Sequence, residues 1–570
     1  MSCPPSGREE IARLELGKTE ISLRLARILV VVFLATAALP ACLQFALHIA
    51  KPAADSLAPS DPGGRPPAGF STSAARVPDA AIERRLPSFA SLAGLIPSGR
   101  ALRRFEDHLN ETSTATRMLA PWVGWTIKGV LRGGDEQAYF GRAGWLFYRP
   151  SVDSVTGPGF MTAKWRRERL RSADPSLPLP QPDPLKALIQ FKRQLDARGI
   201  ALVVVPTPGK ESVLPERLTS RAGGGPAIVQ NPSFDRLKSE LGKAGVDVFD
   251  PATVLLERRR RLGEDVYLKT DTHWSAAAMG VVAAKLAAHL IGSNLLPWER
   301  KVSWQTRQVP ITNSGDLTAM LNLPKEQQFF PPETVRITRV ETPEGQPWVA
   351  DPGATVLLLG DSFCNIYSLA AMGWGDSAGF AEHLSLNLGR PVDRIVINAG
   401  GASSTRQELA REIISGRDRL AGKRLVIYQF AARELAFGDW KLFDLPTATA
   451  ATRDSPGLGE DRIVRGRVAA IARPPQPGSV PYRDCLIAIH LTELRSAPFG
   501  VQETACLVYT MGMRDNRWLP ISSVTVGADL ECRLRDWAQV ENRYGGLNRA
   551  ELDDLDLLSL PTYWAEGVAP

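Results

Sequence analysis

The sequence contains few cysteines and few histidines for its 570 residues. None of its six cysteines forms a C-x-x-C pair, which excludes a zinc ribbon and a thioredoxin-type redox motif. It also lacks a Walker loop, an H-E-x-x-H helix motif and a G-x-G-x-x-G turn. Motif evidence for a nucleoside triphosphatase, a zinc protease or a dinucleotide-binding enzyme is therefore missing. With only six histidines, the list of candidate general bases is short.

Neither sign of charge dominates. The chain has 68 Lys and Arg against 61 Asp and Glu, a formal net charge of +7. Spread over 570 residues, this excess is too small to indicate nucleic-acid binding. The content of 44% hydrophobic and 23% charged residues is that of a globular protein, and the length allows three or four domains.

One long hydrophobic run is present, at residues 28–50, and it carries no formal charge. A helix of this length spans about 35 Å, enough to cross a bilayer. Arg24 and Arg27 precede the run, which predicts that residues 1–27 stay in the cytoplasm and that the rest lies outside it. A cleaved signal peptide and a buried helix are the alternatives. Residues 51–89, rich in Pro, Ala, Gly and Ser, are expected to form a linker.

Apolar runs and helical patterns alternate across residues 90–445, which predicts an α/β domain with a parallel sheet and helices on both faces. Strands are expected at 200–205, 246–249, 354–359, 394–398 and 424–430, and helices at 184–198, 233–243, 274–291, 377–388 and 404–415. Residues 460–545 contain only strand patterns and predict a small β domain, as a sandwich. Residues 546–570 are expected to be a C-terminal tail.

Two short motifs bring together residues suited to nucleophilic catalysis. Gly360-Asp361-Ser362 directly follows an expected strand, and ligands of parallel sheets bind at the carboxyl ends of strands. Asp271 and His273 lie two residues apart before an expected helix, so both side chains can point to the same side. They match the base and orienter of a serine triad. Each motif alone also fits a helix-capping turn, and a metal site is the weaker alternative because no second histidine lies nearby.

Taken together, the motifs resemble a known family. Asp271-Thr272-His273-Trp274, followed some 90 residues later by Gly360-Asp361-Ser362-Phe363, is similar to the alginate O-acetyltransferase family of SGNH-hydrolase-like periplasmic proteins. Ordinary SGNH hydrolases place the Asp and His after the serine. Three further stretches support the resemblance, which covers about residues 100–440: GRAGWLFY at 141–148, VPTPGK at 205–210 and SGDL at 314–317.

The resemblance implies an extracytoplasmic acetyltransferase with its catalytic domain in the periplasm, and the hydrophobic run at 28–50 predicts that one helix holds it in the inner membrane. Ser362 would be the nucleophile, His273 the general base and acid, and Asp271 the orienter. Acetyl groups would pass through an acetyl-serine to hydroxyls of an alginate-like or other exopolysaccharide. A membrane-bound O-acyltransferase would supply the acetyl group, and neither a cofactor nor a metal is implied.

The resemblance also suggests residues around the triad. Asn398 or Gly400 would complete the oxyanion hole. From their position at and just past the end of the last expected strand, Tyr428 and Arg433 are expected to bind sugar or acetyl oxygen. Core packing for Tyr428 and an ion pair with Glu434 for Arg433 are the alternatives. Lys210 would bind an anionic sugar. By analogy, residues 460–545 would bind carbohydrate. An acetyl esterase with the same triad, and a non-catalytic carbohydrate-binding or assembly protein, are the competing functions.

Overall fold

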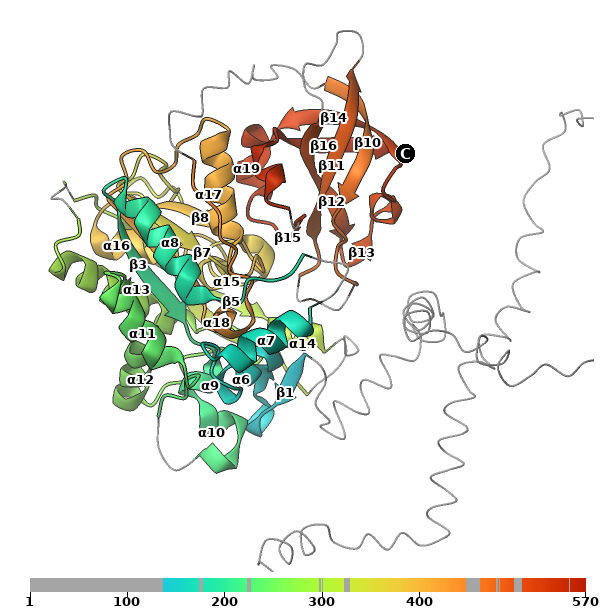
Figure 1. The fold of residues 1–570 in the computed structure, drawn as a ribbon. Helices are drawn as coiled ribbons and strands as arrows, with labels where there is room; N and C mark the ends of the chain where they lie inside the picture. Colours follow the sequence, from blue (N-terminus) through green and yellow to red (C-terminus); the bar gives the residue numbers. More distant parts are fainter. Residues whose placement is uncertain are drawn as a thin grey trace, which may run out of the picture. The chain divides into compact units, whose positions relative to one another are not determined.

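The computed structural model describes residues 137–173, 178–222, 227–296, 299, 301–321, 329–446, 462–477, 480, 482–496, 505–552 and 554–569 (Figure 1). The expected membrane span at 28–50 and the expected linker at 51–89 lie outside these ranges. Among the residues within them, no helix is long and apolar enough to cross a membrane.

A five-stranded parallel sheet forms the centre of the α/β domain, as the sequence predicts. Its strands lie in the order β4-β3-β9-β7-β8 (Figure 1). Every residue of β7 and β9 is buried, which explains their uninterrupted apolar sequences. The bounds are β3 Ala201–Thr207, β4 Asp247–Val248, β7 Val356–Gly360, β8 Asp393–Val396 and β9 Leu425–Ala431.

Helices cover both faces of this sheet. Consecutive residues of β7 alternate between two hydrophobic clusters, since Leu358 belongs to one and Leu357 and Leu359 belong to the other. The first cluster includes residues of α12 (Pro251–Leu262), α13 (Ala276–Gly292) and α16 (Phe380–Leu388). The second includes residues of α8 (Pro184–Asp196), α11 (Phe234–Lys243) and α17 (Ser404–Ile414).

Smaller elements complete the α/β domain. The stretch between α13 and β7, for which the sequence predicts no regular structure, contains the antiparallel pair β5 (Gln305–Asn313) and β6 (Glu333–Glu341). Most residues of β5 are exposed, so it lacks the apolar alternation that marks a half-buried strand. The other elements are β1 Ala138–Phe140, β2 Leu146–Tyr148, α6 Arg149–Thr156, α7 Ala163–Arg171, α9 Lys210–Val213, α10 Pro215–Leu218, α14 Asp316–Met320, α15 Ser362–Asn365 and α18 Glu434–Phe437.

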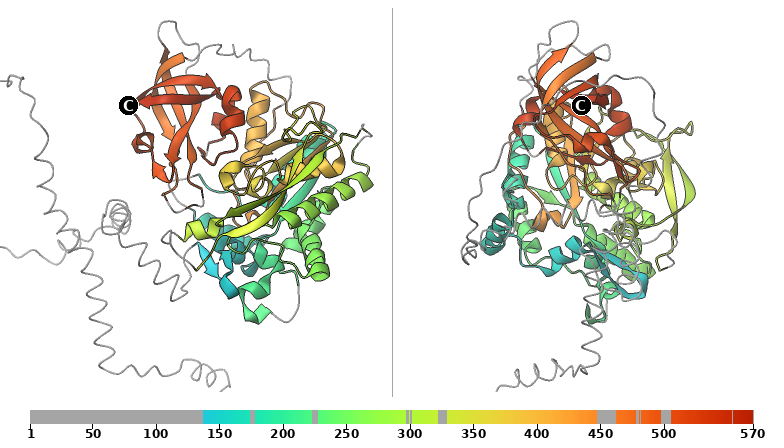
Figure 2. Two further views of the ribbon diagram at one scale, coloured as in Figure 1. Left: turned by 180° about the vertical axis from the view of Figure 1, so that it is seen from behind. Right: turned by 90° about the vertical axis from the view of Figure 1, so that its right-hand side faces the viewer.

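The C-terminal region forms a small barrel, so the expectation of a sandwich is wrong. Its main strands pair in the order β12-β16-β14-β10-β11, and β11 pairs again with β12, which closes the sheet (Figure 2). Strand β16, which lies between β12 and β14, falls within the expected tail at 546–570. The bounds are β10 Arg462–Ile471, β11 Cys485–Ser496, β12 Ala505–Arg514, β13 Arg517–Trp518, β14 Asp529–Asp536, α19 Trp537–Tyr544, β15 Arg549–Ala550 and β16 Thr562–Ala569.

Candidate active site

Ser362 begins the short helix α15 immediately after β7, at the carboxyl edge of the sheet. Asp361 caps this helix, since one of its carboxylate oxygens accepts from the Phe363 backbone N–H at 2.9 Å. Its other oxygen accepts from the Ala431 backbone N–H at 2.7 Å. These two bonds join the turn that carries Ser362 to the end of the neighbouring strand β9.

The side chain of Gln429, in β9, also holds this turn. Its Oε1 accepts from the Asp361 backbone N–H at 2.9 Å, and its Nε2 donates to Asp361 Oδ1 and Thr207 Oγ1, each at 3.0 Å. The turn leaves no room for a side chain at Gly360, where a Cβ would lie 2.5 Å from Cys364 Sγ. The serine is therefore held by the ends of three adjacent strands.

The Asp271 and His273 side chains extend from a loop that spans residues 268–273. The loop is closed by a bond from the Leu268 backbone N–H to the His273 carbonyl, 3.1 Å long. Lys210 Nζ donates to the carbonyls of Leu268 and Lys269, at 2.8 and 3.2 Å. Glu333 of β6 accepts from the backbone N–H groups of Lys269 and Thr270, both at 2.9 Å. Side chains from two other elements thus hold the backbone of this loop.

The structure brings Ser362, His273 and Asp271 together in one hydrogen-bonded chain, as the motifs predict. His273 Nε2 lies 2.9 Å from Ser362 Oγ, and its Nδ1 lies 2.7 Å from Asp271 Oδ1. Asp271 and His273 are only 2% and 3% exposed. The edge of the imidazole meets the ring of Phe363, with centroids 4.8 Å apart. This geometry lets the histidine take a proton from the serine hydroxyl.

Hydrogen bonds keep Asp271 ionised despite its burial. Its Oδ2 accepts from the Asp316 backbone N–H at 3.0 Å and from Trp374 Nε1 at 2.9 Å. Burial by itself would raise the pKa of Asp271, but the bond and charge of His273, together with these donors, lower it below its usual value. Burial would lower the pKa of His273, yet the Asp271 bond and the charges of Asp271, Asp316 and Asp361 raise it.

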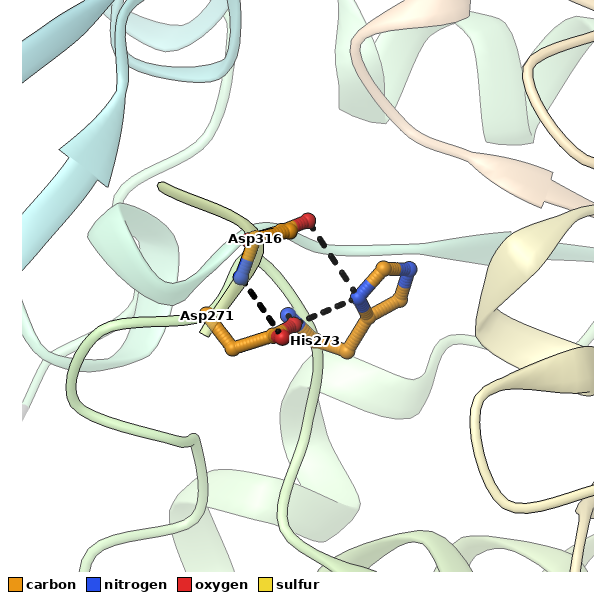
Figure 3. Close-up of side chains that lie close together, drawn as sticks. All are labelled: Asp271, His273 and Asp316. Atoms are coloured by element: carbon orange, nitrogen blue, oxygen red, sulfur yellow. Dashed lines mark hydrogen bonds and ion pairs between the residues drawn. The ribbon is translucent and has the colours of Figure 1, made fainter. Parts of the chain in front are cut away.

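A second carboxylate, that of Asp316, lies on the same side of the imidazole (Figure 3). Its Oδ2 is 3.7 Å from His273 Nδ1 and accepts from Thr272 Oγ1 at 2.5 Å. Its Oδ1 accepts from the Thr272 backbone N–H at 2.7 Å. Burial, followed by the charge of Asp271, raises the pKa of Asp316 to about 6.

The ligand atoms of Asp271, His273 and Asp316 all lie within 4.8 Å of one another, a spacing that a metal ion could bridge. The hydrogen bonds argue otherwise. The oxygens of both carboxylates already accept N–H or O–H donors, from His273, Trp374, Thr272 and the Asp316 backbone. A cation would have to displace these donors, so the arrangement fits the orienting side of a proton-transfer site better than a metal centre.

Two of the residues expected to bind sugar are buried in structural roles. Lys210 is 2% exposed, and its ammonium donates to the loop carbonyls, which gives it a structural role in holding the loop. Tyr428 is 1% exposed, its hydroxyl donates to the Ala402 carbonyl, and its ring packs against Phe430 and Trp440. The alternative of core packing is therefore the correct one for Tyr428.

Arg433 and the two expected oxyanion residues lie at the same edge of the sheet. The guanidinium of Arg433 stacks 5.2 Å from the ring centroid of Tyr148 and lies 3.5 Å from Glu434 Oε1. Asn398, in the loop after β8, is buried, and its Oδ1 accepts from Asn365 Nδ2 at 2.9 Å. Gly400 lies in the same loop, where its carbonyl accepts from Ser404 Oγ. Among the described residues, none of these three forms a hydrogen bond or an ion pair with Ser362.

Several residues that shape the site were missed in the sequence. Asp316 and Gly315 belong to the SGDL stretch at 314–317, which carried the family resemblance without a role for either residue. Gln429, Trp374 and Glu333 had no signal, because each lies 60 or more residues from the group that it contacts. Only the folded chain brings them to the site.

Comparisons with known proteins show what the chain is similar to. The family model described as "SGNH hydrolase-like domain, acetyltransferase AlgX" matches residues 138–432, just over half of the chain. The "Probable alginate O-acetylase AlgJ" of Pseudomonas aeruginosa is 24% identical over 285 residues, which are 49% of this chain and 66% of that protein. The protein of the same name from Azotobacter vinelandii is 29% identical over 187 residues, 31% of this chain and 47% of that protein. The chain thus spans between about half and just under two thirds of these relatives.

Solved structures give weaker overall matches. The O-acetyltransferase domain of Pseudomonas putida AlgJ is 20% identical with a TM-score of 0.40, and the match covers 53% of this chain and 93% of that domain. Pseudomonas aeruginosa AlgX is 17% identical with a TM-score of 0.36, and the match covers 64% of this chain and 73% of that protein.

Proposed function

We propose, from the premise that the chain belongs to the family of the SGNH hydrolase-like domain of acetyltransferase AlgX, that it transfers acetyl groups to hydroxyls of an exopolysaccharide. The family resemblance inferred from the motifs is thereby confirmed. One observation carries the proposal: the hydrogen-bonded chain Ser362–His273–Asp271 lies at the carboxyl edge of a parallel sheet. This is the arrangement that activates a serine for acyl transfer.

In the first half of the proposed reaction, Ser362 Oγ attacks the carbonyl carbon of an acetyl donor. His273 Nε2 removes the hydroxyl proton as the bond forms. It then delivers that proton to the departing group as the tetrahedral intermediate collapses. The product is acetyl-Ser362, and Asp271 stays ionised throughout, holding the imidazolium through Nδ1.

In the second half, a sugar hydroxyl attacks the acetyl-serine carbonyl. His273 Nε2 removes the sugar proton and returns it to Ser362 Oγ as the ester bond to the serine breaks. The sugar leaves as its O-acetyl ester, and the enzyme regains its starting state. If water takes the place of the sugar, the same steps release acetate, which is the esterase reaction.

The surroundings of the triad supply the remaining proposed roles. Asn398 and Gly400 stay predictions for the oxyanion hole. Because Asn398 Oδ1 accepts from Asn365, its Nδ2 is the atom that would donate to an oxyanion. Arg433, half-buried beside Tyr148, is the one of the three predicted sugar contacts that we retain.

The proposed setting follows from the family and from the hydrophobic run at 28–50. One helix would hold the protein in the inner membrane, with the catalytic domain in the periplasm. A membrane-bound O-acyltransferase would supply the acetyl group. The barrel would bind the polysaccharide, as its place after the catalytic domain suggests. These partners are proposals, because the chain covers only part of its curated relatives.

The test is incubation of the full chain with a small acetyl ester as donor, with and without oligosaccharides. Acetylated uronic-acid or neutral oligosaccharide is the expected product, and Ser362→Ala should form none. If the protein releases acetate at the same rate with and without oligosaccharides, and forms no acetylated sugar, it is an esterase. Absence of both products, with glycan binding intact, would support a binding or assembly protein.

A further inference from the structure

We propose that Asp316 is a positioning residue of the catalytic histidine, a second carboxylate that fixes the segment Asp271–His273 and adds negative charge beside Nδ1 of the imidazole. The inference deepens the proposed function and rests on it for its catalytic meaning. Its structural part rests on the hydrogen bonds and the ion pair drawn as dashed lines in Figure 3.

Asp316 reaches the triad through both its backbone and its side chain. Its backbone N–H donates to Asp271 Oδ2 at 3.0 Å, so it helps to orient the carboxylate that orients the histidine. Its side chain accepts from the Thr272 backbone N–H at 2.7 Å and from Thr272 Oγ1 at 2.5 Å. Thr272 lies between the two catalytic residues. Asp316 therefore holds both the carboxylate of Asp271 and the backbone of the residue that links Asp271 to His273.

The close approach depends on the residue before it. A Cβ on Gly315 would lie 2.2 Å from the carbonyl carbon and oxygen of Thr270 and 2.5 Å from the Asp271 nitrogen. Real Cβ atoms do not come so close to backbone atoms, so only glycine lets the two segments touch. Asp316 then starts α14 directly against the loop of residues 268–273.

Charged groups from several elements face this pair. Asp361 follows β7 and acts on His273 in the same sense as Asp271 and Asp316. Lys210 of α9 lies within electrostatic range of Asp271, Asp316 and Glu333, and Tyr148 of β2 lies within range of Asp316. Burial and the charge of Asp271 raise the pKa of Asp316 to about 6. At a pH above this value, two carboxylates favour the imidazolium, whereas only Asp271 does so below it.

The direction of the effect follows from this charge. His273 must be neutral to act as a base, so kcat/KM falls on the acidic side as the histidine becomes protonated. An ionised Asp316 raises the pKa of His273, which moves that acidic limb to higher pH. Asp316→Asn keeps the shape of the side chain and removes the charge. We therefore expect the acidic limb to move to lower pH by about 1 unit.

A matched control separates charge from mechanical support. Glu333 also holds the loop of residues 268–273. It accepts hydrogen bonds of 2.8 to 2.9 Å from Lys269 and Thr270, as Asp316 accepts hydrogen bonds from Thr272. It is not among the main charges acting on His273. Glu333→Gln should lower kcat if it loosens the loop, but it should leave the acidic limb in place. An equal displacement in both variants, or none in Asp316→Asn, would overturn the proposal.

The same comparison can be made without turnover. The imidazole resonances of the full chain are titrated by NMR, and His273→Gln assigns the signal. The pKa of His273 should fall in Asp316→Asn and not in Glu333→Gln. If the wild-type chain transfers no acetyl group, the proposed function fails, while this titration still decides the role of Asp316.

A second variant applies if Asp316→Asn does not fold. Thr272→Val keeps the volume but removes the hydroxyl that donates to Asp316, which raises the pKa of this carboxyl further. Less of the negative charge is then present at a given pH. The pKa of His273 should move in the same direction as in Asp316→Asn, by a smaller amount. An unchanged titration would contradict the proposal.

Discussion

At the scale of the residue, the buried polar side chains of this site act mostly on backbone. Lys210, Glu333 and Asp316 all bond to main-chain atoms of the loop that carries His273. Each bond satisfies a buried N–H or carbonyl and at the same time fixes the loop. The histidine is therefore positioned by groups that do not touch the reacting atoms.

The nucleophile and its orienter are expected to differ in importance. Ser362→Ala should lower acetyl transfer by about 10⁶-fold and Asp271→Asn by about 10⁴-fold, because the second change only misorients the base. Steady-state rates with a small acetyl ester measure both. Mass spectrometry of the wild type with a slow donor should show one acetyl group on the peptide that contains Ser362. Near-normal turnover by Ser362→Ala would rule out the acyl-enzyme mechanism.

Gly315 is expected to tolerate no side chain. Gly315→Ala would force the SGDL stretch away from Thr270 and Asp271, so kcat should fall at least tenfold and the melting temperature should decrease. Gly242→Ala is the matched control, since a Cβ at this position of α11 meets no atom within 4 Å. It should leave activity unchanged and stability equal or slightly higher. Normal kinetics in Gly315→Ala would show that the contact is dispensable.

The sequence predicted the triad because its members are carried by short motifs next to recognisable strands. It could not predict the fate of Lys210, which follows the end of β3, or of Tyr428, which lies in the middle of β9, since at both positions either a ligand or the core can be the partner. Burial decides between these, and burial depends on residues far along the chain. The role of Trp374, 103 residues from the carboxylate that it contacts, is a clear case.

At the scale of the element, the central strands β3, β7 and β9 of the parallel sheet were predictable because they are buried on both faces and read as unbroken apolar runs. The pair β5 and β6 was missed since exposed residues dominate β5. The barrel was taken for a sandwich because a strand pattern shows which residues face the core, but not which strands pair with one another. It could not show that β12 and β11, the two ends of the row of main strands, are paired. Only the bond ladder between β11 and β12 closes it.

Helix α17 carries a buried ion cluster that should matter for stability. Glu408 lies 3.2 Å from Arg549 Nη1 of β15 and also pairs with Arg411, and its side chain is 4% exposed. Glu408→Gln leaves two buried cations short of a partner, so the free energy of unfolding should drop by about 3–5 kcal/mol. Thermal or urea unfolding measures this.

The exposed ion pair Arg465–Glu531 of the barrel provides the control for this cluster. Glu531→Gln should change the unfolding free energy by about 0–1 kcal/mol, because water screens the pair. Equal effects of the two substitutions would mean that the Glu408 cluster contributes no more than a surface pair.

At the scale of the whole molecule, the hydrophobic run at 28–50 predicts where the protein resides. The full chain should fractionate with membranes and keep its N-terminus, and protease added from the periplasmic side should digest the catalytic domain. Cell fractionation followed by N-terminal sequencing makes the measurement. A soluble protein that begins after Ala41 or Ala50 would point to a cleaved signal peptide.

The position of β16 in the barrel has a consequence for the order of folding during synthesis. Residues 562–569 lie between β12 and β14, so both of these strands lack a neighbour until the ribosome has passed that point. The five strands of the catalytic sheet are all translated by residue 431. The catalytic domain can therefore finish folding first, while the barrel exposes two open edges and depends on quality control until its last-made strand arrives.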